Sequence, residues 1–155
     1  MELTGSVASQ AEKERLWDAI FNASYWKEAI PDAEKYEKIG DNLYEMAVKV
    51  DIGPIKGNQT VKVQFSELQP PDSCDFEVQN QLVKTAKGSF TLKDAAEAVA
   101  VDADDPLPEG TKTVLDYRLE ADAGNPFFNA MLEGFKGKIK DGFEELLGRV
   151  EEKAR

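Results

Sequence analysis

The stretch 126-PFFNAMLEGFKGKIKDGFEELLGRVEE-152 decides the fold of this chain. At about 100° per residue its large apolar side chains form one stripe about 120° wide, which is typical of a helix that packs on a sheet. The stripe consists of Phe128, Met131, Leu132, Phe135, Ile139, Phe143, Leu146 and Val150. The pattern therefore predicts one long amphipathic helix from Pro126 to about Glu152, long enough to cross a whole sheet.

Four glycines interrupt this predicted helix, although each weakens a helix relative to alanine. Gly142 lies within the apolar stripe, where a missing side chain would allow close approach to the sheet or leave space. Gly134, Gly137 and Gly148 lie on the opposite side. Two explanations stay open for them: the helix tolerates the loss, or a flat outer surface binds a partner.

The residues before the helix alternate between apolar and polar side chains with a period of two, as half-buried strands do. The alternating segments are 2–8, 34–39, 44–52, 55–65, 74–78, 86–92 and 115–119. After the first segment, apolar residues at helical spacing predict two short helices, with Ser9 and Glu12 as a capping box and Pro31 as a stop.

This order of elements predicts an α+β fold in which a curved antiparallel sheet of six or seven strands wraps around the long C-terminal helix. Two short helices follow the first strand. A length of 155 residues suits a single domain, 1–155. We expect the acidic segment 94–110 to form an extended hairpin loop, either a passive insertion or a lid.

The chain has no histidine, one cysteine and a formal net charge of −11. These counts exclude Ser-His-Asp and Cys-His catalysis, histidine-held zinc or iron, and an internal disulfide. The negative charge disfavours nucleic acid as a partner. We expect no cofactor and no dedicated metal site, because only carboxylates such as Asp102, Asp104 and Asp105 remain, and these favour weak Ca²⁺ or Mg²⁺ binding.

The N-terminal residues lack the basic and apolar regions of a signal peptide. No run approaches the ~18 apolar residues that a membrane span needs. With its single cysteine, Cys74, the sequence therefore predicts a soluble, cytoplasmic protein.

Five short motifs follow one another along the chain: Met1-Glu2-Leu3-Thr4-Gly5, Ile30-Pro31, Gly53-Pro54-Ile55-Lys56-Gly57, Leu68-Gln69-Pro70-Pro71 and Ala86-Lys87-Gly88. In this order and at this spacing they resemble the CoxG family, named after the G subunit of carbon monoxide dehydrogenase, a branch of the START-like (SRPBCC) helix-grip superfamily. The resemblance runs from the first residue to the C-terminal helix.

The resemblance implies a cavity between the long helix and the sheet that suits an apolar molecule. Family members associated with carbon monoxide dehydrogenase and similar molybdenum hydroxylases are thought to bring the enzyme to the membrane or to carry quinone to it. The implied function is that of a non-enzymatic binding protein for a quinone-like or lipid-like ligand. The implied partner is a molybdenum hydroxylase, and the implied location is the cytoplasm or the membrane periphery.

The strand register places a set of side chains on the face toward the long helix, where they could surround such a ligand. The apolar contacts are expected from Met46, Val61, Phe76, Phe90 and Tyr117 on the strands and from Phe128, Met131 and Phe135 on the helix. Gln59, Asn80 and Tyr44 would supply the polar contacts. For Gln59 and Asn80 the alternative is a position near a strand end, with the amide in water.

Two other functions compete with the carrier. The first is an enzyme of the cyclase or hydrolase type, which needs a buried carboxylate or tyrosine with a shifted pKa. Its candidates are Tyr44, Tyr117, Asp116 and Glu120, of which strand parity directs Asp116 and Glu120 outward. The second is a protein-interaction module with a solid core, which would use the outer face of the helix.

Overall fold

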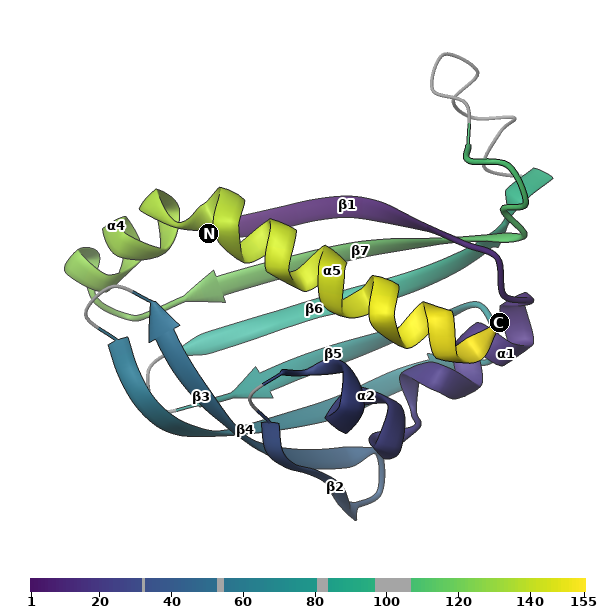
Figure 1. Ribbon diagram of the computed structural model, residues 1–155. Helices are drawn as coiled ribbons and strands as arrows, with labels where there is room; N and C mark the ends of the chain where they lie inside the picture. The colour runs from purple at the N-terminus through teal and green to yellow at the C-terminus, as the bar shows by residue number, and fades with distance from the viewer. Residues whose placement is uncertain (32, 53–54, 81–83, 97–106) are drawn as a thin grey trace.

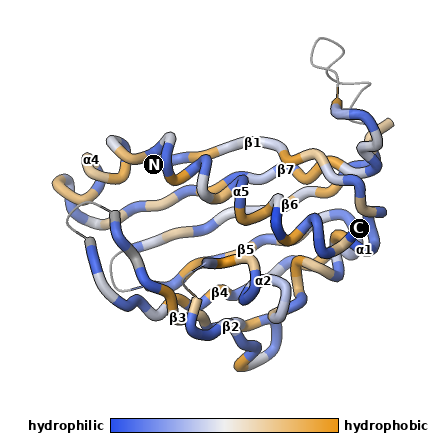
Figure 2. The backbone as a smooth tube through the Cα atoms, viewed as in Figure 1, coloured by the Kyte–Doolittle hydropathy of each residue, from blue (hydrophilic) through white to orange (hydrophobic). Residues whose placement is uncertain are grey.

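The computed structural model describes residues 1–31, 33–52, 55–80, 84–96 and 107–155. Seven strands form one antiparallel sheet in the order β1-β7-β6-β5-β4-β3-β2. Their bounds are β1 Glu2–Ser9, β2 Ala33–Gly40, β3 Leu43–Ile52, β4 Ile55–Gln69, β5 Ser73–Gln79, β6 Thr85–Asp94 and β7 Thr113–Asp122. Figure 2 shows that hydrophobic and hydrophilic stretches alternate along the chain through these strands.

Two short helices follow β1, namely α1 (Lys13–Ile20) and α2 (Ala23–Ala29). At the other end of the chain, α5 (Lys136–Ala154) crosses one face of the curved sheet (Figure 1). The predicted α+β architecture, a helix-grip fold with a curved antiparallel sheet around a C-terminal helix, is therefore confirmed. Only the ends of the predicted acidic loop, residues 94–96 and 107–110, are among the described residues.

The prediction of one unbroken helix from Pro126 to Glu152 is wrong. The segment forms α4 (Pro126–Gly134) and α5, which meet at Phe135, where the backbone leaves helical geometry with φ −103° and ψ 8°. The junction lies between Gly134 and Gly137, two residues of poor helix propensity. None of the nine residues of α4 is buried, whereas α5 buries Leu147, Val150, Glu151 and Ala154.

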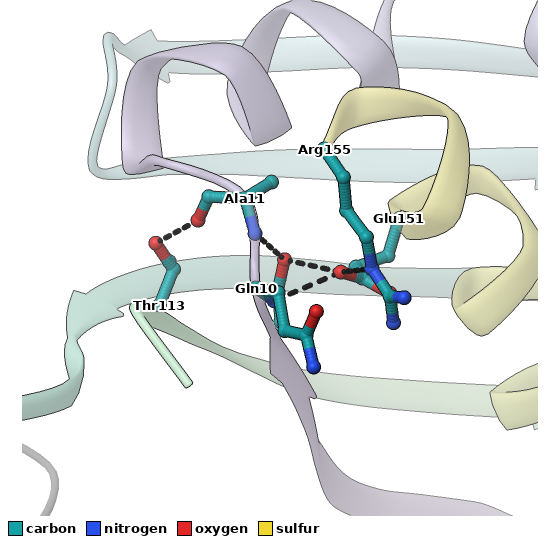
Figure 3. A network of polar contacts seen from close by, with 6 residues as sticks. Gln10, Ala11, Thr113, Glu151 and Arg155 are labelled. Atoms are coloured by element: carbon teal, nitrogen blue, oxygen red, sulfur yellow. Dashed lines mark hydrogen bonds and ion pairs between the residues drawn. The ribbon is translucent and has the colours of Figure 1, made fainter. Parts of the chain in front are cut away.

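The predicted capping box at Ser9 is also wrong. Helix α1 begins at Lys13, and no side chain caps it. The Ser9 hydroxyl instead donates to Glu151 Oε1 at 3.0 Å and accepts from the Ala11 N–H at 3.0 Å. Glu151 also accepts from the Gln10 N–H at 2.9 Å and from the Arg155 guanidinium at 2.8 and 2.9 Å, so the end of α5 is bound to the turn after β1 (Figure 3).

The core on the concave face of the sheet is a row of aromatic rings. Phe21, Phe65, Phe76, Phe90 and Phe143 follow one another with ring centroids 4.8–6.3 Å apart. Gly88 makes room for this row, since a Cβ there would lie 2.6 Å from Phe76 Cζ and 2.1 Å from a backbone oxygen of the neighbouring strand. The row joins α1, the sheet and α5 into one core.

Candidate ligand cavity

A cavity of about 220 Å³ lies between the concave face of the sheet, α2 and α5. Its wall is made almost entirely of apolar and aromatic side chains. They are Trp26 and Ile30 from the α2 region, Tyr36, Met46, Val63, Phe65, Phe76, Val78, Phe90 and Leu119 from β2 to β7, and Phe143 and Leu146 from α5.

Strand parity and helical spacing explain how these side chains meet. Met46 pairs with Val61 across β3 and β4, and Val63 pairs with Val78 across β4 and β5, so their side chains point to one face. Phe143 and Leu146 lie three residues apart on α5 and share one side of that helix. The wall thus combines the period-two face of the sheet with the period-3.6 face of α5.

The two polar side-chain groups on the wall, those of Trp26 and Tyr36, are neutral. The Trp26 indole N–H donates to the Ile20 carbonyl at 2.7 Å. Burial, and to a lesser degree the neighbouring Tyr44, raises the pKa of Tyr36, so its hydroxyl stays protonated. The described wall carries no carboxylate, lysine or arginine. Such a space favours an uncharged, largely apolar molecule.

Three of the residues expected to contact a ligand lie on the wall, namely Met46, Phe76 and Phe90. Two others, Tyr44 and Tyr117, are buried on the same face but are bonded elsewhere. The Tyr44 hydroxyl donates to the Phe21 carbonyl at 3.0 Å. The Tyr117 hydroxyl donates to Glu144 Oε1 at 2.6 Å, and burial together with this contact raises the pKa of Tyr117.

Val61, Gln59 and Asn80 lie beside the wall rather than on it, and all three are half-buried. Asn80 Nδ2 donates to the Thr60 carbonyl at 2.9 Å, which holds this amide against β4. The Gln59 Oε1 atom is buried and, within the described part of the chain, has no hydrogen-bond partner.

The structure does not bring Phe128, Met131 and Phe135 to the cavity wall. The break at Phe135 separates α4 from α5, and the apolar side chains before the break are half-exposed. Phe127 at the start of α4 is 69% exposed. The helical part of the wall comes instead from Phe143 and Leu146, two later members of the same sequence stripe.

Sequence patterns did not indicate the contribution of α2 and β2, which supply Trp26, Ile30 and Tyr36 to the wall. Their apolar character was visible, but no local pattern shows that α2 folds back over the sheet. The other wall residues on the strands lie on the same face as the predicted ones, so extending the strand alternation identifies them as inward-facing. They are Val63, Phe65, Val78 and Leu119.

The carboxylates considered for catalysis or metal binding lie away from the cavity. Asp116 accepts from the Ser6 hydroxyl at 2.5 Å and pairs with Lys93 at 3.0 Å, and Glu120 pairs with Arg118 at 2.5 Å. Asp102, Asp104 and Asp105 lie outside the described residues. Among the residues that are described, no group of three or more Cys, Asp or Glu side chains is placed to hold a metal ion.

The family model for the G subunit of carbon monoxide dehydrogenase (CoxG) matches residues 5–132. No curated protein matches the chain significantly. None of the described helices is long and apolar enough to cross a membrane.

Solved structures with the same fold cover nearly the whole chain at low sequence identity. A conserved protein from Geobacillus kaustophilus is 17% identical, with 99% of this chain and 95% of that chain covered and a TM-score of 0.76. A START superfamily protein from Mycobacterium smegmatis is 13% identical, with 97% of each chain covered and a TM-score of 0.68. The Zhui aromatase/cyclase from Streptomyces sp. R1128 is 17% identical, with 100% and 96% covered and a TM-score of 0.60. At these identities the likeness concerns the fold.

Proposed function

The chain belongs to the CoxG family of carbon monoxide dehydrogenase, and from this premise we propose that it is a non-enzymatic binding protein for an apolar, quinone-like or lipid-like molecule. The observation that carries the proposal is the cavity of about 220 Å³ whose described wall holds no charged side chain. Transfer of an apolar molecule from water into such a space is favourable in proportion to the apolar area that it buries.

The partner is the second part of the proposal. Membership of the family supports a molybdenum hydroxylase of the same organism as the protein that receives or delivers the ligand. In this role the chain moves a water-insoluble molecule to an enzyme and leaves the redox step to that enzyme. Addition of the purified chain should then raise the rate at which the hydroxylase reduces a poorly soluble quinone, and should leave its rate with a water-soluble acceptor unchanged.

Filling the cavity tests the binding function. Val78 is a half-buried wall residue, so we expect Val78→Trp to occupy the space and to weaken binding of the uncharged dye N-phenyl-1-naphthylamine or of naphthalene by roughly tenfold or more. Met131→Trp on α4 is the matched control, because Met131 is absent from the wall and the substitution should leave binding unchanged. A parent protein that binds neither probe contradicts the proposal.

A cyclase-type enzyme is the second candidate, and one observation favours it. Tyr36 is the one titratable side chain on the described wall, and its raised pKa keeps a proton available to a bound carbonyl compound. Tyr36→Phe separates the two candidates. A carrier keeps its ligand affinity and has no turnover to lose, whereas an enzyme keeps its affinity and loses turnover of a cyclisable polyketide substrate.

A further inference from the structure

Gln59 occupies an inward position on β4 at the edge of the cavity. It shares strand parity with Val61 and with the wall residue Val63. Met46, another wall residue, pairs directly with Val61, which makes Gln59 its diagonal neighbour across the two strands. Diagonal neighbours on one face lie about 7–8 Å apart, within reach of a long side chain. Gln59 does not line the cavity, but its side chain is long enough to reach the edge of the space that a ligand would fill.

The buried end of this amide is an acceptor that lacks a donor. Gln59 Oε1 has almost no contact with solvent, and it is the one buried side-chain oxygen or nitrogen among the described residues without a hydrogen-bond partner. A buried carbonyl oxygen without a donor destabilises a folded protein, because the atom has lost its bonds to water and gained none in return.

Other polar side chains on or near the cavity wall donate hydrogen bonds to backbone carbonyls. The Tyr44 hydroxyl donates to the Phe21 carbonyl, Asn80 Nδ2 donates to the Thr60 carbonyl, and the Trp26 N–H donates to the Ile20 carbonyl. Within the described part of the chain none of these groups donates to Gln59 Oε1. A bound molecule that carries a donor would satisfy this oxygen.

We infer that the ligand carries a hydrogen-bond donor, a hydroxyl or N–H group at the edge of an apolar body, and that Gln59 Oε1 accepts this hydrogen bond. The inference rests on the proposed binding function and narrows its ligand class. Phenols, hydroquinones and long-chain alcohols have such a group, whereas hydrocarbons and esters have none. A quinone carbonyl only accepts, so the site favours a hydroquinone over the corresponding quinone at this position.

A pair of fluorescent compounds, one with the donor and one in which a methyl group blocks it, tests the inference. 2-Naphthol has a hydroxyl group, and 2-methoxynaphthalene replaces its hydrogen by a methyl group. The Kd of each compound is measured for the parent protein, for Gln59→Met and for Gln79→Met. Gln79 is exposed on β5, so Gln79→Met is the matched control for the loss of an amide. Thermal melts of all three proteins show that they are folded.

We expect the parent and Gln79→Met to bind 2-naphthol roughly two- to tenfold more tightly than the ether, which is the effect of one neutral hydrogen bond. In Gln59→Met this preference should disappear, while affinity for the ether stays within about twofold of the parent's. Gln59→Leu should behave in the same way, and it replaces the methionine variant if that protein does not fold.

Two results overturn the inference, and they are distinguishable from each other. If the parent binds the ether as tightly as the naphthol, or if Gln59→Met and Gln59→Leu keep the preference, the donor is not recognised by Gln59 and the apolar-carrier function still stands. If the parent binds neither compound, the carrier function fails and the inference fails with it.

Discussion

The Tyr117 hydroxyl donates a 2.6 Å hydrogen bond to Glu144 Oε1 and thereby joins β7 to α5 directly. The Tyr117 ring also packs edge-on against Phe143, with ring centroids 4.9 Å apart, and Phe143 forms part of the cavity wall. Gly5 on the neighbouring strand β1 faces Tyr117 in the register and leaves the space that this contact occupies. This hydrogen bond and ring contact thus add to the bonds of Glu151 in positioning the helix that covers the cavity.

We expect Gly5→Ala to lower the free energy of unfolding by about 1–3 kcal/mol, the usual cost of overpacking. The added Cβ would lie 2.5 Å from Tyr117 Oη and 2.7 Å from Glu144 Oε1, so the bonded pair has to separate or α5 has to move. Urea denaturation measures the change. An unaltered midpoint would show that the pair yields without cost, and that Gly5 has no role in placing α5.

Gly142→Ala should have the opposite effect. The sequence left two alternatives for the missing side chain at Gly142, close approach to the sheet or empty space, and a Cβ there meets nothing within 4 Å, which excludes the close approach. Since alanine favours the helix by about 1 kcal/mol over glycine, we expect Gly142→Ala to stabilise the protein by about that amount. The same denaturation experiment tests it, and it serves as the control for Gly5→Ala. A destabilised Gly142→Ala protein contradicts the open space around that residue.

Acid should remove the stabilisation that Glu151 provides. Burial by itself would raise the pKa of this carboxyl, but hydrogen bonds from Arg155, the Gln10 N–H and Ser9 outweigh burial and hold the pKa below its ordinary value of 4.5. A carboxyl whose pKa is lower in the folded protein than in the unfolded chain stabilises the fold at pH values above its unfolded-state pKa. This stabilisation is lost as the pH falls through the folded-state pKa. We expect the stability to decline as the pH falls below about 5.

Glu151→Gln tests this assignment. At pH 7 the variant should be less stable than the parent, because the Arg155 guanidinium loses its buried anionic partner, and the difference should shrink as the pH falls toward 3. Glu152→Gln, a change at the exposed neighbouring residue, is the control and should parallel the parent at every pH. A difference that is constant from pH 7 to 3 would falsify the linkage to Glu151.

Cys74 should be inert in the folded protein. Its side chain is 1% exposed, and burial, with a smaller effect of Asp75, raises the pKa of the thiol to about 12. Because the thiolate is the reactive form, we expect no reaction with 5,5′-dithiobis(2-nitrobenzoate) at pH 8 in buffer and one reacting thiol per chain in urea. Rapid labelling without denaturant would show that β5 opens locally.

The sequence by itself determined which side chains face the helix. Period-two alternation placed Met46, Phe76 and Phe90 on one face of the sheet, and the sequence stripe that predicted the C-terminal helix contains Phe143 and Leu146. These assignments succeed because the direction of a side chain on a strand or helix depends on the repeat of that element alone. For the same reason, strand alternation directed the side chains of Asp116 and Glu120 away from the helix.

Only the tertiary structure decided where the elements end and what covers the cavity. The partner of Ser9 is Glu151, 142 residues away, so a local capping pattern gave the wrong bond. The stripe after Pro126 is continuous in the sequence, yet α4 and α5 separate at Phe135, which removes Met131 from the wall, while α2 brings Trp26 to it. The bond of Ser9 to Glu151 and the packing of α2 over the sheet are contacts between distant segments, which outweigh local preferences of about 1 kcal/mol per residue and cannot be deduced from spacing along the chain.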